Sequence, residues 1–171
     1  NNYTYIELGD GDELWESSKM SDIINNYSNV FWALSNFYKQ GRIYFIYGNH
    51  DIVKKDKKYA KKNFCEAFDE TLRSYITLFK DVEFHEALVL KERHGDNKIL
   101  LIHGHQGDFA NDKMWRVTRF LVRYVWRVLE IYGVNDPTST AKNYNKKNII
   151  EERFSQWAKE RQTMVITGHT H

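Results

Sequence analysis

Residues 43–51, IYFIYGNHD, join an uninterrupted apolar run directly to a short polar motif. A continuous apolar run that ends at a glycine is typical of a strand buried in a parallel sheet. Gly48 lets the chain turn sharply after the strand and lets other backbone approach closely. The stretch therefore predicts a buried parallel strand whose carboxyl end carries Asn49, His50 and Asp51.

Three further strand-like runs end in the same way. Residues 3–8 precede Gly9-Asp10, residues 99–102 precede His103-Gly104-His105, and residues 164–167 precede Gly168-His169-Thr170-His171. In open α/β sheets, ligand sites gather outside the carboxyl ends of the strands. We therefore expect these motifs, which lie far apart in the sequence, to meet in space.

The segments between these strands show helical and strand patterns. Apolar spacing and turn residues predict helices over residues 21–40, 59–75, 112–132 and 149–159, and a further strand over residues 86–92 that a polar turn joins to residues 98–103. Strands that alternate with helices predict an α/β fold. The lysine-rich residues 54–62 are predicted to form a solvated face.

Composition limits the class of protein. A chain of 171 residues predicts one domain, and 42% hydrophobic with 15% aromatic residues is enough for a core. The net charge of +2 is too small to indicate a nucleic-acid partner. The single cysteine, Cys65, excludes an internal disulfide framework and fits a reducing compartment. Without a bilayer-length apolar run or a signal-peptide pattern, the sequence predicts a soluble, cytoplasmic protein.

The polar motifs offer one kind of chemistry. Aspartate, asparagine and histidine supply mixed oxygen and nitrogen ligands, which suit divalent Mn, Fe or Zn. Cysteine is absent from the motifs, which argues against a structural zinc site. Two such ions about 3.5–4 Å apart would clamp a phosphate and activate a water molecule. The pattern indicates a two-metal site for phosphate chemistry.

The series GD, GNHD, HGH and GHTH, each after an apolar run, resembles the calcineurin-like metallophosphoesterases over residues 8–171. The resemblance implies that Asp10 bridges two metal ions and that Asn49 and His169 bind the second ion. It implies further that His171 binds the first ion and that His103 is the isolated histidine ligand of the family.

The resemblance also implies roles in catalysis. His50 matches the histidine that contacts phosphate and protonates the leaving group, and Asp51 is expected to orient its ring, because an imidazole acting as an acid needs a partner that fixes its tautomer. We expect hydrolysis of a phosphate ester or pyrophosphate by metal-activated water. Alternatives are a nuclease-like or protein-phosphatase-like member and a non-catalytic binding module.

Two ligand assignments stay open, and one motif departs from the family. Asp12 is a rival to Asp10, and His105 could replace His103, support the site from outside, or cap a helix. The family opens with an Asp-x-His motif, and none precedes Asp10. Because the sequence begins with Asn1 and ends inside a motif, we expect it to be part of a longer chain that carries this segment; loss of the first metal is the alternative.

The predicted helix over residues 112–132 has an unusual composition. Arg116, Arg119, Arg123 and Arg127 share one stripe, while most other side chains are large and apolar. In one interpretation the helix simply packs, with its arginines in water. In the other, residues 112–160 form a helical cap in which Arg116, Arg119 and Arg123 bind substrate phosphates and the apolar face meets a lipid-like group or a membrane surface.

The cap and the Gly9-Asp10…Glu13-x-Trp15 pattern resemble the UDP-2,3-diacylglucosamine hydrolase branch of the family. This branch typically has arginine at the position of His50 and aspartate at that of His105, so the match is not strict. We expect a layered α/β/β/α sandwich with mixed sheets in one domain over residues 1–171. The expected substrate is a small-molecule or lipid-linked phosphate.

Overall fold

The computed structural model describes residues 3–69, 72–107, 114–126 and 144–169. Within these residues, one sheet has the order β1 (Tyr5–Leu8), β2 (Ile43–Ile46) and β5 (Phe84–His85), and its strands are parallel. A second sheet has the order β6 (Ala87–Lys91), β7 (Lys98–Ile102) and β8 (Met164–Thr167). In it, β6 and β7 are antiparallel, whereas β7 and β8 are parallel. The predicted α/β fold with mixed sheets is confirmed.

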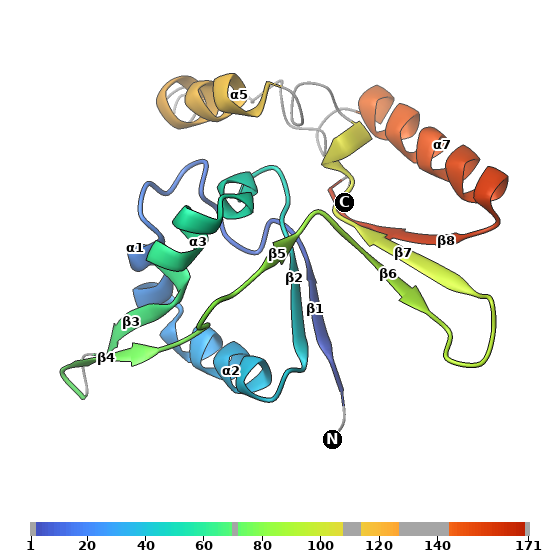
Figure 1. Ribbon diagram of the computed structural model, residues 1–171. Coiled ribbons are helices and arrows are strands. Elements are labelled where there is room, and N and C mark those ends of the chain that lie inside the picture. The colour runs from blue at the N-terminus through green and yellow to red at the C-terminus, as the bar shows by residue number, and fades with distance from the viewer. Residues whose placement is uncertain (1–2, 70–71, 108–113, 127–143, 170–171) are drawn as a thin grey trace.

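Three helices lie against the first sheet, as Figure 1 shows: α1 (Met20–Asn26), α2 (Ser28–Lys39) and α3 (Lys57–Phe64). Buried side chains from these helices and from β2, such as Ile24, Phe31, Phe45 and Phe64, form the main core. The single helix predicted over residues 21–40 is wrong in one respect, because the chain breaks at Tyr27. The break follows two asparagines, which are poor helix formers.

The helix predicted over residues 59–75 is correct up to Phe64 and wrong beyond it. α3 ends at Phe64, and an antiparallel hairpin of β3 (Glu66–Asp69) and β4 (Ser74–Thr77) follows. The strand-forming residues of β4 pair with β3, and the carbonyls of Phe64 and Cys65 accept hydrogen bonds from backbone N–H groups just beyond β4. Pairing within the hairpin therefore outweighs the local helical pattern.

The remaining helices are α5 (Trp115–Leu121) and α7 (Tyr144–Arg161), with 3-10 turns η1 (Ile52–Lys55) and η2 (His105–Gly107) and a π-helical turn η3 (Val122–Trp126) after α5. The helix predicted over 112–132 is present over 115–126, and its other residues lie outside the described part. α7 is longer than predicted. No helix within the described residues is long and apolar enough to cross a membrane.

The strand registers bring the polar motifs together. Leu8 pairs with Ile46, so β1 and β2 end side by side, and Ile102 pairs with Thr167, so β7 and β8 do the same. In Figure 1 the carboxyl ends of both sheets meet near the middle of the molecule, below α5. The expected convergence of the four motifs is confirmed for the residues that the structure describes.

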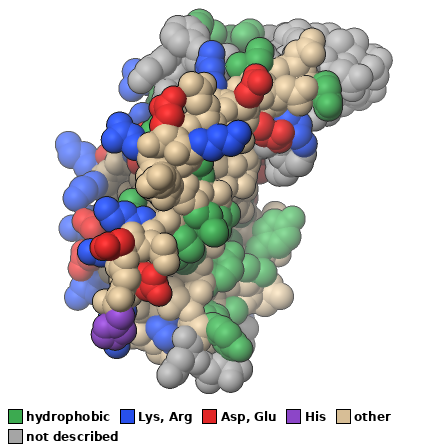
Figure 2. Space-filling model, turned by 90° about the vertical axis from the view of Figure 1, so that its right-hand side faces the viewer, with side chains coloured by type: hydrophobic (Ala, Val, Ile, Leu, Met, Phe, Trp, Pro, Cys, Tyr) green, Lys and Arg blue, Asp and Glu red, His purple; other side chains and the backbone are tan. Residues whose placement is uncertain are grey.

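The outer part of the second sheet remains partly uncovered. Figure 2 views the molecule from this side and shows hydrophobic side chains gathered on it. Exposed apolar residues of the sheet are Val89, Leu90, Met164 and Ile166. The main buried core packs against the first sheet. The first sheet therefore supports the site better than the second sheet does.

Candidate metal centre

Asp10 is placed by the turn that follows β1. Its φ of 56° is uncommon for a residue other than glycine. The turn directs the carboxylate toward the ends of β2 and β7. Its Oδ1 accepts a hydrogen bond from the backbone N–H of His50 at 2.9 Å, and its Oδ2 lies 3.0 Å from Nε2 of His103. Burial raises the pKa of Asp10, but the hydrogen bond and charge of His103 lower it more, to about 2.

Close approach of backbone at Gly48 makes this position of Asp10 possible. A Cβ atom at Gly48 would lie 2.1 Å from Oδ1 of Asp10, which is far inside contact distance. The backbone N–H of Gly48 in turn donates to Oδ1 of Asp51 at 2.6 Å. A glycine is therefore required where the first two motifs meet.

His103 is held in one tautomer. Its Nδ1 lies 2.8 Å from the carbonyl oxygen of Leu8, and because a carbonyl only accepts, Nδ1 carries the proton. Its Nε2 faces Oδ2 of Asp10 at 3.0 Å and Oδ1 of Asn49 at 3.2 Å. A lone pair and two acceptor oxygens repel one another unless a proton or a cation lies between them. This arrangement fits a cation site.

His169 completes the cluster. The parallel pairing of β7 and β8, and a hydrogen bond from the N–H of Gly168 to the carbonyl of His103 at 2.9 Å, place it beside His103. Ligand atoms of Asp10, His103 and His169 lie within 4.8 Å of one another. One carboxylate and two imidazoles suit Mn, Fe or Zn. His171 lies outside the described residues.

The structure separates the two rival assignments. His105 is buried beside His103, with 5.6 Å between ring centroids, but it is outside the metal-sized cluster. Burial and the neighbouring His103 and His169 lower the pKa of His105 to about 3, so its ring is neutral. Its Nδ1 has no hydrogen-bond partner among the residues that the structure describes. Asp12 is engaged by a lysine, which leaves Asp10 and His103 as the better candidates.

A second carboxylate cluster surrounds Lys54 rather than a metal. The Nζ atom of Lys54 lies 2.6 Å from Asp12, 2.6 Å from Asp51 and 3.5 Å from Glu7. Lys54 is only 2% exposed. Burial lowers the pKa of Lys54, but the charges of Asp51, Asp12 and Glu7 raise it well above its ordinary value. Lys54 therefore does not belong to the solvated face predicted for residues 54–62.

Asp51 supports the backbone of the site and does not contact the ring of His50. Its Oδ1 accepts from the N–H groups of Gly48 at 2.6 Å and Asp10 at 3.4 Å, and its Oδ2 pairs with Lys54. The expectation that Asp51 orients His50 is thus corrected, because its oxygens are already used. Asp51 fixes the relative position of the first two motifs.

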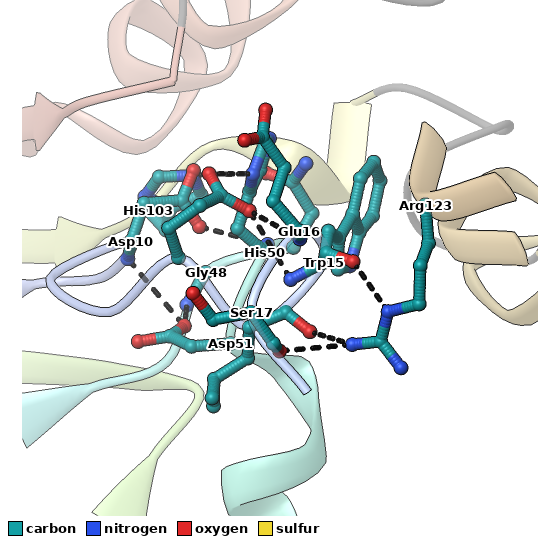
Figure 3. A network of polar contacts seen from close by, with 12 residues as sticks. Asp10, Trp15, Glu16, Ser17, Gly48, His50, Asp51, His103 and Arg123 are labelled. Carbon is teal, nitrogen blue, oxygen red and sulfur yellow. Dashed lines mark hydrogen bonds and ion pairs between the residues drawn. The ribbon is translucent and has the colours of Figure 1, made fainter. Parts of the chain in front are cut away.

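The ring of His50 is held by Glu13 and Trp15 instead; Figure 3 shows His50 and Trp15 from close by. Nδ1 of His50 lies 2.6 Å from Oε2 of Glu13, and the indole of Trp15 stacks on the imidazole with 4.4 Å between centroids and 14° between planes. Burial lowers the pKa of His50, but Glu13 and nearby Asp10 raise it more. Sequence reasoning noted the Glu13-x-Trp15 pattern only as a family resemblance and did not connect either residue with His50.

The predicted cap arginines fall into two groups. Arg116 and Arg119 surround Trp115, with guanidinium carbons 5.5 and 5.6 Å from the ring centroid, and Nζ of Lys55 lies 5.5 Å from the same centroid. Arg123 instead donates hydrogen bonds to backbone carbonyls of residues 14–17. Within the part of the chain that the structure describes, no side-chain hydrogen bond engages Arg116 or Arg119, whereas three of the five donors of Arg123 are in use.

Comparison with known proteins gives one match. The family model described as calcineurin-like phosphoesterase matches residues 2–171. No curated protein and no solved structure matches the chain. The resemblance inferred from the four motifs is confirmed, and the likeness to the UDP-2,3-diacylglucosamine hydrolase branch stays a prediction.

Proposed function

The chain belongs to the calcineurin-like phosphoesterase family, and we propose that it hydrolyses a phosphate ester or pyrophosphate at the centre formed by Asp10, Asn49, His103 and His169. One observation carries this proposal. His103 is fixed through Nδ1 so that its Nε2 faces Oδ2 of Asp10 and Oδ1 of Asn49. These atoms have no favourable arrangement without a proton or a cation among them.

The ligand set supports divalent Mn, Fe or Zn in this centre. When bound, such an ion neutralises phosphate charge and lowers the pKa of water. Asp10, His103 and His169 would hold it, with Asn49 beside them. A second ion and a ligand role for His171 remain part of the proposal.

His50 would act as the acid of the reaction. As the oxygen of water forms a bond to phosphorus and gives up one proton to solvent, the bond from phosphorus to the leaving oxygen breaks, and that oxygen takes a proton from Nε2 of His50. The backbone N–H of His50 is bound to Asp10, which keeps the ring beside the centre. Glu13 accepts a hydrogen bond from Nδ1–H, so the ring that donates from Nε2 is the doubly protonated one, whose pKa Glu13 and Asp10 raise.

The substrate proposed is one with more than a single phosphate, or with a lipid attached. Lys55, Arg116 and Arg119 gather three positive charges around Trp115. Next to them, Val117 and Phe120 are 51% and 59% exposed. Cations beside an apolar face suit a pyrophosphate with a lipid-like substituent, at the surface of a membrane in the cytoplasm.

The test is chelator-sensitive turnover. Protein stripped of metal and then given Mn²⁺ should hydrolyse an aryl phosphate monoester, an aryl diester or a pyrophosphate ester, and excess chelator should abolish the activity. Asn49→Ala and His103→Ala should each reduce it at least about 100-fold, whereas Lys57→Met, on the exposed start of α3, should not. Salt-dependent binding to vesicles with no turnover of any of these substrates would favour the binding-module alternative.

A further inference from the structure

The π-helical turn η3 reaches across to the loop that follows the first motif. Arg123 is the residue that makes this contact (Figure 3). Its Nε donates to the carbonyl of Trp15 at 2.8 Å, and its Nη2 donates to the carbonyls of Leu14 at 2.6 Å and Ser17 at 2.9 Å. One guanidinium therefore gathers three carbonyls from four consecutive residues that lie more than 100 positions away in the chain.

The same loop holds the ring of His50 from its other side. Oε2 of Glu13 binds Nδ1 of His50, and the indole of Trp15 covers one face of the imidazole. Oε1 of Glu13 accepts from the backbone N–H of Trp15 at 3.1 Å and of Glu16 at 3.3 Å. The N–H groups of this turn thus fix the carboxylate that binds His50, while its carbonyls are fixed by Arg123.

These contacts form one continuous path from the helix to the imidazole. Leu14 and Trp15 are 3% and 2% exposed, so their carbonyls need partners inside the protein. Hydrogen bonds from a charged guanidinium are stronger than neutral ones. Without Arg123 the carbonyls would have to turn toward water, and the turn that aims both Glu13 and Trp15 would move with them.

We propose that Arg123 is a positioning residue for His50: it holds the 13–17 turn so that Glu13 and Trp15 keep the imidazole aimed at the centre. This role replaces direct phosphate binding in our account of Arg123. The location of Arg123 in a π-helical turn agrees with this role, since such turns recur at functional sites. The proposal rests on the proposed function only where it concerns proton transfer; the position of the ring can be measured separately.

The direct measurement is the NMR signal of the His50 ring in histidine-labelled protein. The chain has seven histidines, and His50→Gln identifies the signal. The stacked indole of Trp15 shifts the ring protons of His50 by its ring current, so Arg123→Met should move this signal. Arg42→Met is the matched control, because Arg42 also donates to a backbone carbonyl, that of Tyr3 at 2.6 Å, and directly precedes β2, at the strand end opposite the site.

The kinetic measurement compares leaving groups. In Arg123→Met, turnover of phenyl phosphate should fall about ten-fold or more, because phenol is a poor leaving group that needs a proton, while turnover of 2,4-dinitrophenyl phosphate should fall less than about three-fold. Mn²⁺ uptake should equal that of the wild type, since the structure shows Arg123 in contact with the 14–17 carbonyls and with none of the described ligands Asp10, Asn49, His103 and His169. Arg123→Lys should restore part of the loss.

The outcomes separate the two proposals. An unchanged His50 signal together with an unchanged leaving-group dependence in Arg123→Met would overturn the positioning role and leave the proposed function intact. A wild type that hydrolyses no phosphate ester with Mn²⁺ would overturn the proposed function, and the NMR comparison would still decide the role of Arg123. If Arg123→Met does not fold, the same comparison is made with Arg123→Gln, which lacks the positive charge, and an unshifted signal in that variant would count against the role.

Discussion

Replacing Lys54 with methionine tests whether its buried ion pairs stabilise the part of the fold that carries the site. Methionine keeps most of the length and the apolar stem of lysine but removes the ammonium group. The buried carboxylates of Asp12 and Asp51, each 2.6 Å from Nζ, and of Glu7 at 3.5 Å would then face one another without a counter-charge. The substitution should therefore destabilise the fold strongly, although it removes no proposed metal ligand.

The magnitude follows from these distances. With an effective dielectric constant of about 20, each 2.6 Å contact contributes roughly 6 kcal/mol of attraction. Desolvation of the ions offsets most of this, and breaking a buried ion pair typically costs about 3–5 kcal/mol. For a domain of this size, that loss lowers Tm by roughly 6–20 °C. It is also a large part of the about 5–15 kcal/mol that stabilises an ordinary domain.

Urea unfolding in excess chelator measures this effect without a contribution from bound metal. Lys57→Met is the matched control, because Lys57 forms a single exposed ion pair with Glu83 at 3.3 Å. Such surface pairs contribute about 0–1 kcal/mol. If the free energy of unfolding falls by less than about 1 kcal/mol in Lys54→Met, as in the control, then the ion pairs of Lys54 do not stabilise the fold.

Three further predictions follow from individual contacts. Glu13→Gln should lower turnover of phenyl phosphate about ten-fold or more while Mn²⁺ uptake is unchanged, because it weakens only the support of His50; equal loss of uptake would contradict this role. Gly48→Ala should weaken Mn²⁺ uptake measured by calorimetry, since its Cβ would displace Oδ1 of Asp10; wild-type affinity would show that the contact is dispensable. Burial raises the pKa of Glu7, because the folded state favours its protonated carboxyl group. The stability that this group contributes is complete at low pH and is lost as pH rises through its folded-state pKa. In urea unfolding, the stability of Glu7→Gln relative to the wild type should therefore rise with increasing pH, and a relative fall would contradict this sign.

The sequence was sufficient for the strand ends because the signal there is local. The apolar run of residues 43–47 and the glycine motif that follows lie next to each other, so the strand, the turn and the exposed polar residues can be predicted together. Parallel pairing then brings the motifs to one edge without further information. For this reason Asp10, Asn49, His103 and His169 could be identified from the sequence as neighbours.

The supports of the site could not be predicted, because they depend on long-range contacts. Lys54 is the first residue of a lysine-rich stretch, and nothing nearby indicates that three carboxylates from different segments surround it. Glu13 meets His50 across 37 positions, in a loop without periodicity. The hairpin after α3 was missed for a related reason, since pairing between its strands decided the conformation of residues 66–77.

The central claim is that the strand-end motifs form a divalent-metal centre. It is tested most directly by titrating Mn²⁺ into chelator-stripped protein by calorimetry, for the wild type, for Asp10→Ala and for Lys57→Met. We predict saturable Mn²⁺ uptake by the wild type and by Lys57→Met. Asp10→Ala should lose at least about 100-fold in affinity, because the Asp10 carboxylate faces both His50 and His103. No saturable uptake by the wild type at millimolar Mn²⁺, Fe²⁺ or Zn²⁺, or uptake that Asp10→Ala leaves unchanged, would show that the strand-end motifs do not bind a divalent metal ion through Asp10.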